Sequence, residues 1–176
     1  MYRWVTLPAR NRDVVAYLSG PGEAKARAGP VLRAMTRGVH DVGAFGNGSA
    51  VKCVANLLVA VHNAAAAEAL VLAERAGLDL ATVLAAVRDG AGTSRMFEVR
   101  GPAMAAADYS GPGMRARVFG KDLEIIAGFA RDVGSPTPLF ALASQFYQAA
   151  LAQGRGEEDT ACVHAVLRGL AGAPVR

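Results

Sequence analysis

The chain has 176 residues, of which 52% are apolar, 19% charged and 6% aromatic, a composition typical of one globular domain with a small appendage rather than of a disordered chain. The formal net charge is only +4, and the arginines are scattered from Arg3 to Arg176 without a run of five or six. A nucleic-acid-binding surface is therefore not expected.

The first elements predicted along the chain form a strand-helix-strand unit. Residues 13–18 are rich in β-forming side chains and end at a Ser-Gly-Pro-Gly turn, which favours a strand followed by a turn. A helical stretch at residues 23–37 and a second short strand at residues 39–42 follow, and Gly43 closes the unit. One such unit has the size of a βαβ motif and cannot form a stable parallel sheet alone.

The rest of the chain has a helical pattern that is interrupted where glycine and proline fall. Asp79 and Asp159 are placed to act as N-caps of the second and sixth predicted helices. The six predicted helices are residues 49–76, 80–88, 94–107, 115–133, 138–153 and 160–170. The main body is accordingly predicted to be an all-α bundle, with residues 1–43 as a separate remnant and residues 44–176 as the helical domain.

The most apolar segment, residues 50–73, is interpreted as a buried helix of a soluble protein. It contains both charged and amide side chains, whereas a membrane span needs about 20 predominantly apolar residues. Arginines near the N-terminus leave no apolar stretch for a secretory signal, so a cytoplasmic protein without a membrane partner is expected. Cys53 and Cys162 lack metal-ligand spacing and are interpreted as reduced packing residues, with no metal site.

Candidate chemistry begins where the long helix begins. Glycines at 43, 46 and 48 allow a tight turn into its N-terminus, and Lys52 and Asn56, four residues apart, share one helix face. A cationic acid/base group and an amide donor would point the same way. Asn63, two turns further on, would continue this polar stripe, and His62 would lie off it. The alternative is that Lys52 is an exposed first-turn lysine and that the two asparagines are satisfied polar residues inside a bundle.

The pattern GxxGxGxxxKxxxN, from Gly43 to Asn56, resembles the catalytic segment of the β-hydroxyacid dehydrogenase family, which includes 3-hydroxyisobutyrate dehydrogenases. By position, the resemblance implies that Lys52 is the catalytic acid/base, and that Asn56 and Gly48 bind substrate. Family members often carry a second asparagine where this chain has Ala55. A lysine in this role works best when burial lowers its pKa toward the working pH.

A second motif, Lys121-Asp122-Leu123, resembles the family's KDL sequence and implies that Lys121 binds the cofactor, NAD or NADP. As a three-residue string it also fits an ordinary solvated ion pair. Its distance from the first motif, and the prolines and the Gly-Arg-Gly segment that follow, are in the family's order. The sequences around residues 62–69 and 94–102 are similar to dehydrogenases of four-carbon sugar acids such as threonate.

The resemblance also implies an architecture. The expected fold is a helical bundle like the C-terminal domain of 6-phosphogluconate dehydrogenase, preceded by a strand-helix-strand remnant of a Rossmann domain, and assembled as a homodimer or higher oligomer through the long helix. The family's GxGxxG loop is missing, and residues 1–13 contain no glycine. The chain is thus expected to be an enzyme fragment, a truncated reading frame or a split subunit that needs a separate Rossmann-domain chain to bind the nucleotide. The alternative function is a non-catalytic helical dimerisation or binding module.

Overall fold

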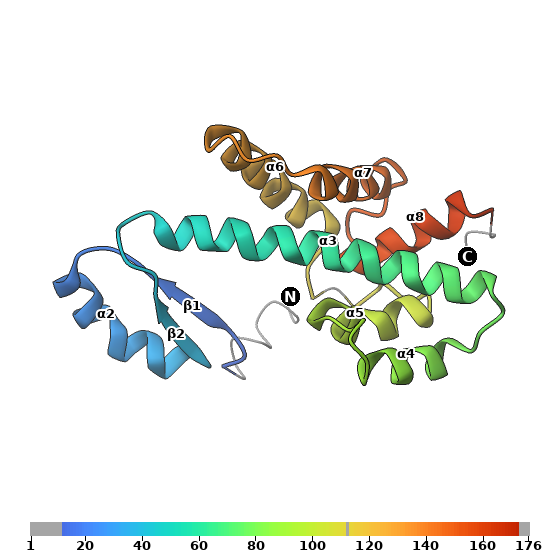
Figure 1. Ribbon diagram of the computed structural model, residues 1–176, viewed down its shortest axis with the longest axis horizontal. Helices are drawn as coiled ribbons and strands as arrows, with labels where there is room; N and C mark the ends of the chain where they lie inside the picture. Colours follow the sequence, from blue (N-terminus) through green and yellow to red (C-terminus); the bar gives the residue numbers. More distant parts are fainter. Residues whose placement is uncertain (1–11, 112, 173–176) are drawn as a thin grey trace. The chain divides into compact units, whose positions relative to one another are not determined.

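The computed structural model describes residues 12–111 and 113–172. Within these ranges the chain is mostly helical with one short two-stranded parallel sheet (Figure 1). Its contacts divide it into two compact units, one ending at Asn56 and the other beginning at Leu57. Helix α3, Asn47–Arg75, contributes residues to both units. The expected domain boundary after residue 43 lies before this helix and stays a prediction.

The first unit is the predicted strand-helix-strand motif. Strand β1, Val15–Leu18, runs parallel to β2, Gly38–Asp41, and helix α2, Gly22–Met35, connects them. Val15 pairs with Gly38 at one end of the register. The predicted element order is confirmed, with ends that differ by one or two residues. Parallel sheets are normally larger and covered on both faces, so a sheet of two four-residue strands depends strongly on what surrounds it.

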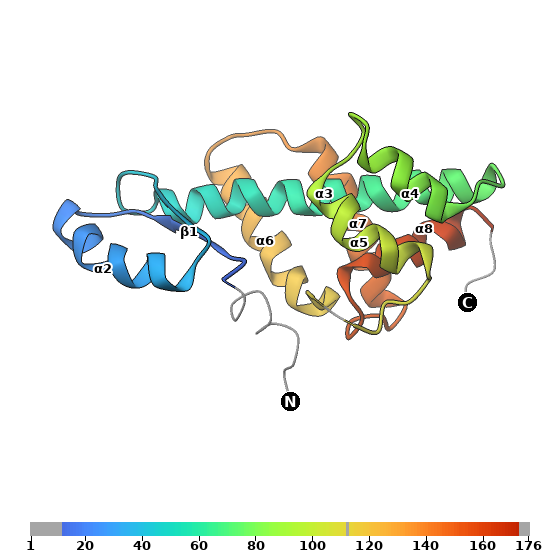
Figure 2. The ribbon, with the colours of Figure 1, turned by 90° about the horizontal axis from the view of Figure 1, so that it is seen from below.

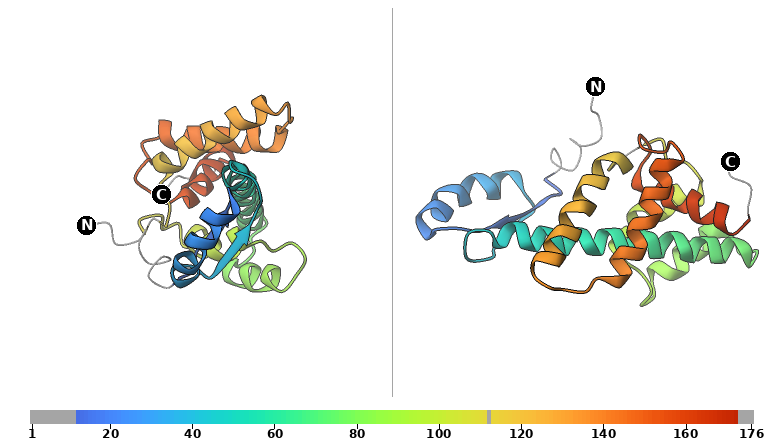
Figure 3. Two further views of the ribbon diagram at one scale, coloured as in Figure 1. Left: turned by 90° about the vertical axis from the view of Figure 1, so that its left-hand side faces the viewer. Right: turned by 90° about the horizontal axis from the view of Figure 1, so that it is seen from above.

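The second unit contains the remaining helices (Figures 2 and 3). They are α4, Leu80–Arg88; α5, Arg95–Ala105; α6, Ala116–Asp132; α7, Pro138–Ala152; and α8, Val163–Leu170, preceded by a 3₁₀ turn at Thr160–Cys162. Helices α6 and α7 lie side by side, and α4 packs with α5. The six predicted helices are thus present, and only the last differs in kind, because its first turn is 3₁₀.

Both predicted caps are present. The Asp79 carboxylate accepts a hydrogen bond from the amide of Thr82 at 2.8 Å and caps α4. The Asp159 carboxylate accepts one from the amide of Ala161 at 2.9 Å, at the start of the 3₁₀ turn. These side chains satisfy amide groups that have no partner inside the helix.

The polar stripe predicted along α3 ends inside the protein core. Asn63 is fully buried, and its side-chain amide donates to the hydroxyl of Tyr147 and to the carbonyl of Thr160, each at 2.9 Å. The Tyr147 hydroxyl in turn donates to the carbonyl of Ala60 at 3.2 Å. Asn63 therefore links α3, α7 and the 3₁₀ turn as a hydrogen-bonded core residue, as the alternative interpretation of this asparagine predicts.

Among the described residues, α3 is the one helix long and apolar enough to cross a bilayer by length and composition. Its second half is nevertheless packed against other helices. The residues of α3 that the protein buries are Ala60, Asn63, Ala64, Ala66, Ala67, Leu70, Val71 and Ala73. The small alanine side chains let neighbouring helices approach closely, and the buried asparagine has protein partners, as in a core helix.

Candidate active site

Side chains on both sides of the loop that leads into α3, those of Asp41 and Asn47, fix it by hydrogen bonds. Gly43 and Gly46 have φ angles of +90° and +94°, a conformation that side chains other than glycine rarely adopt. The Asp41 carboxylate accepts from the Gly43 amide at 2.9 Å, and the Asn47 side chain donates to the Val42 carbonyl at 2.8 Å. The predicted tight turn before the helix is therefore present.

Gly48 lies where the first turn of α3 meets the end of β1. Its amide donates to the Ser19 hydroxyl at 3.2 Å. A Cβ atom at position 48 would lie 2.9 Å from the carbonyl oxygen of Tyr17 and 3.0 Å from the Ser19 Oγ. Close packing against the strand therefore requires glycine here, independently of any ligand. The predicted contact of Gly48 with substrate stays a prediction.

Gly48→Ala is expected to destabilise the protein by about 1–3 kcal/mol, because the backbone carbonyl of Tyr17 cannot yield as a flexible side chain would. Urea denaturation of the full chain measures this change. Gly22→Ala is the matched control, since nothing lies within 4 Å of its added Cβ and its φ is not in the left-handed region. Equal stability of the two variants would show that the strand and the helix are not in close contact.

Lys52 and Asn56 project from α3 one and two turns after Gly48. Lys52 is exposed and Asn56 is half-buried. No hydrogen bond or ion pair joins either side chain to another residue in the ranges 12–111 and 113–172. Because residues four apart lie on the same helix face, the ammonium and amide groups are available together to a ligand.

Lys25, which the sequence places outside every motif, has a structural partner. Its ammonium lies 2.8 Å from the carboxylate of Asp41, the same group that accepts the Gly43 amide. These hydrogen bonds, that of Lys25 first, hold the pKa of Asp41 below its usual value. Lys25 therefore supports the loop into α3.

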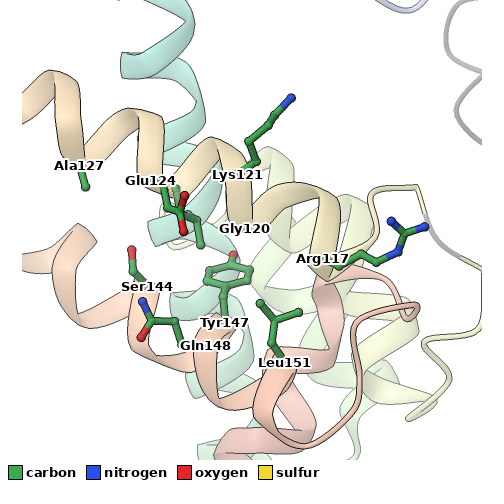
Figure 4. Close-up of a pocket in the computed structure, with 10 residues that line it drawn as sticks. Arg117, Gly120, Lys121, Glu124, Ala127, Ser144, Tyr147, Gln148 and Leu151 are labelled. Carbon is green, nitrogen blue, oxygen red and sulfur yellow. The ribbon is translucent and has the colours of Figure 1, made fainter.

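Lys121 belongs to the second unit, at the rim of a groove of about 410 Å³ between α6 and α7. In Figure 4 the Tyr147 ring lies at the centre of this groove, and the Lys121 side chain points away from it. Lys121 is exposed, which also fits the alternative of an ordinary solvated residue. Its predicted contact with the cofactor stays a prediction.

The buried carboxylate of Asp159 fixes the start of α6, in addition to the local cap that the sequence predicts. Asp159 accepts hydrogen bonds from the amides of Gly113 and Met114, at 2.7 and 3.0 Å, and from Arg100 Nε at 3.1 Å. The Arg100 and Asp159 side chains are 11% and 9% exposed, so this pair is well shielded from water. It ties α5 and the 3₁₀ turn to the segment from which Lys121 projects.

The described residues contain no group of three or more His, Cys, Asp or Glu side chains arranged to hold a metal ion. Both cysteines are free thiols, with Cys53 half-buried and Cys162 buried. Burial raises the pKa of Cys162 to about 12, which keeps this thiol protonated at neutral pH.

Known proteins are similar to this chain. Residues 46–167 match a family described as NAD-binding of NADP-dependent 3-hydroxyisobutyrate dehydrogenase. An L-threonate dehydrogenase of Cupriavidus necator is 38% identical over 163 residues, which are 92% of this chain and 54% of the relative.

Two solved structures are also similar. A 3-hydroxyisobutyrate dehydrogenase from Salmonella typhimurium is 38% identical, with a TM-score of 0.79 over 84% of this chain and 52% of that chain. The Mycobacterium tuberculosis 3-hydroxyisobutyrate dehydrogenase, solved with L-serine, is 29% identical, with a TM-score of 0.76 over 85% of this chain and 53% of that chain. This chain spans about half the length of the relatives it matches.

Proposed function

The chain belongs to the family described as NAD-binding of NADP-dependent 3-hydroxyisobutyrate dehydrogenase, and we propose that it is the catalytic-lysine half of a hydroxyacid dehydrogenase that uses NAD or NADP. The observation that carries this proposal is the exposed Lys52, which has no side-chain partner among the described residues and shares a face of α3 with Asn56. Lys52 and Asn56 project from the start of a helix that a glycine-rich loop fixes, so a bound ligand would meet both groups.

The roles follow from the side-chain chemistry. Lys52 exchanges a proton with the hydroxyl or carbonyl oxygen of the substrate, and Asn56 holds the substrate by its amide. We also propose, as the resemblance to the family implies, that Gly48 contacts the substrate and that Lys121 contacts the nucleotide. The substrate is a small 3-hydroxy acid, and we favour a four-carbon sugar acid because the Cupriavidus necator relative is named for L-threonate.

The described residues of this chain do not fit the pyrophosphate of a dinucleotide. The β1–α2 turn contains no GxGxxG sequence, and the first turn of α2 carries the acidic side chain of Glu23. A phosphate-binding helix N-terminus instead presents glycine amides and positive potential. When bound, the nicotinamide supplies the hydride acceptor, and the residues of this chain contribute only proton transfer and hydrogen bonding.

We therefore propose that residues 1–43 are a Rossmann-domain remnant and that residues 44–176 are a helical domain like the C-terminal domain of 6-phosphogluconate dehydrogenase. A separate Rossmann-domain chain would complete the enzyme, in the cytoplasm and without nucleic-acid or membrane partners. The alternative is a non-catalytic helical module descended from such an enzyme. The exposed position of Lys52 fits both, because in either case a second surface would cover it.

Nucleotide binding tests the need for a partner. The reconstituted enzyme is defined here as this chain joined to the part of the Cupriavidus necator L-threonate dehydrogenase that it does not match. Calorimetry is expected to give no affinity of the chain alone for NADH or NADPH tighter than about millimolar, since a single ammonium and a few contacts hold a ligand weakly. The reconstituted enzyme should bind far more tightly. A micromolar dissociation constant for the chain alone would contradict the proposal.

A homodimer or higher oligomer through α3 is also proposed. Leu58, Ala65 and Leu72 recur every seven residues on the exposed side of α3, and Leu72 is 71% exposed. A seven-residue apolar repeat is the pattern with which one helix packs along another. Glu68 and Arg75 border the same surface, so their opposite charges can meet across a two-fold axis.

Leu72→Glu is expected to convert the oligomer into an 18.2 kDa monomer, because it places a charge within the apolar repeat. Sedimentation velocity at micromolar concentration measures the change. Leu139→Glu is the matched control, since Leu139 is 69% exposed but lies on α7. A wild-type chain that sediments as a monomer would remove the dimer proposal.

A further inference from the structure

The first turn of α3 has all of its amide groups satisfied, although a helix leaves its first four without partners of its own. Three of them donate to carbonyl oxygens of the loop just before the helix. These bonds are Asn47 N to Ala44 O at 3.1 Å, Ser49 N to Gly46 O at 3.0 Å and Ala50 N to Gly46 O at 3.1 Å. The fourth amide, that of Gly48, donates to the hydroxyl of Ser19, which lies 29 residues earlier in the chain.

Ser19 is itself held in place at the end of β1. The amide of the next residue, Gly20, donates to the carbonyl of Gly43 at 2.9 Å, and Leu18 accepts a hydrogen bond from the amide of Val42 at 2.8 Å. The Ser19 hydroxyl therefore projects from a fixed strand end. Because Gly48 has no Cβ, its amide can approach that hydroxyl to 3.2 Å. Ser19 acts as a helix cap supplied by a distant part of the chain.

We infer that Ser19 is a positioning residue for Lys52. In the helical pattern the amide of Lys52 pairs with the carbonyl of Gly48, one turn before it, so the direction of the lysine depends on the first turn. Without the Ser19 hydroxyl, the Gly48 amide hydrogen-bonds to water and the first turn of α3 unfolds more often. The Lys52 side chain is then no longer held in one position and direction. The inference rests on the proposed function insofar as Lys52 is the group that exchanges a proton.

Amide hydrogen exchange, measured by NMR on the full chain, tests the structural half of this inference. Ser19→Ala is expected to speed exchange of the Gly48 amide by roughly 2- to 30-fold, the effect of losing a helix cap. Ser19→Thr, which keeps a hydroxyl, should restore slow exchange. Ser135→Ala, an exposed serine after α6, is the control and should change nothing at Gly48. Unchanged exchange in Ser19→Ala would overturn the inference whatever the activity.

A test of the positioning of Lys52 needs a measured quantity that a loss of stability alone would not change. In the reconstituted enzyme, Ser19→Ala should lower kcat by roughly 10- to 100-fold with little change in the KM for nucleotide, since a misplaced acid/base group slows the chemical step. Ser19→Thr should recover most of the rate. Asp79→Ala removes a comparable cap from α4 and should leave kcat unchanged.

Equal loss of kcat in Ser19→Ala and Asp79→Ala would overturn the positioning role and leave Ser19 a stabilising residue only. A wild-type reconstituted enzyme without activity would instead count against the proposed function. In that case the NMR chemical shifts of the Lys52 amide and side chain test the inference without an activity measurement. They should shift in Ser19→Ala and stay in place in Asp79→Ala, and resonances unmoved in both would contradict it.

Discussion

Lys52→Ala lowers kcat of the reconstituted enzyme by about 10²- to 10⁴-fold, the range expected for loss of a general acid/base. Lys52→Arg fails as well, because arginine stays protonated in proteins and cannot take up a proton from the substrate hydroxyl. Asn56→Ala has a smaller effect that falls mainly on the KM for the hydroxy acid, since an amide orients the substrate but transfers no proton. Steady-state assays of NADH formation measure all three variants.

The control for these variants is Arg88→Ala. Arg88 is an exposed cation at the end of α4 and has no ion pair within the residues that the structure describes. It therefore changes the net charge of the protein as Lys52→Ala does, without touching the loop into α3. Wild-type activity in Lys52→Ala would assign the chemistry to another group and leave the exposed position of Lys52 without a catalytic meaning.

The second large effect is a loss of stability below pH 6.5 that is caused by one buried histidine. His164 is fully buried in α8, and its Nδ1 lies 2.9 Å from the Tyr109 hydroxyl. Within residues 12–111 and 113–172 its Nε2 has no hydrogen-bond partner. A carboxylate oxygen of Glu74 lies 4.0 Å away, and Arg168 binds the other oxygen of that carboxylate. Burial first, and the charge of Arg168 second, lower the pKa of His164 to about 4.

The sign of the effect follows from proton uptake. Between pH 6.5 and about 4, the histidine of the unfolded chain binds a proton that the folded chain does not, so stability falls as the pH falls through this window. Each pH unit costs up to about 1.4 kcal/mol, or roughly 3 kcal/mol over the window. The stability is fully present above pH 6.5, where both states hold a neutral imidazole.

Urea denaturation at pH 7.0, 5.5 and 4.5 measures this loss. His164→Gln keeps a polar group beside Tyr109 but cannot titrate, so its stability should depend less steeply on pH than that of the wild type. His40→Gln, at an exposed position of β2, is the matched control and should retain the wild-type slope. Identical slopes for the wild type and His164→Gln would show that His164 takes up its proton in the folded state.

Local signals in the sequence predicted the elements well. Helix α4 begins at Leu80 and ends at Arg88, as predicted. Its start could be predicted because the cap is local: the Asp79 side chain accepts from the amide of Thr82, three residues later. The glycines before α3 likewise predicted a tight turn, since only glycine adopts the φ angles found at Gly43 and Gly46 without strain. Caps and turns of this kind are encoded by neighbouring residues.

Contacts between distant residues could not be predicted in this way. Asn63 continues the helix face of Lys52 and Asn56, yet its partners are 84 and 97 residues away, and only the packed bundle brings them together. The pair Lys25–Asp41 is another example, since neither residue belongs to a motif. The hydrogen bond from the Gly48 amide to the Ser19 hydroxyl joins residues 29 positions apart, and nothing in the sequence pairs these two residues.

Turnover by the reconstituted enzyme tests the central claim most directly. The chain, joined to the part of its Cupriavidus necator relative that it does not match, is assayed with NAD and NADP against L-threonate and 3-hydroxyisobutyrate. The account predicts nucleotide reduction with at least one of these acids, and its loss in Lys52→Ala. A reconstituted protein that folds and binds nucleotide, yet oxidises neither acid, would contradict the catalytic role and favour the helical module.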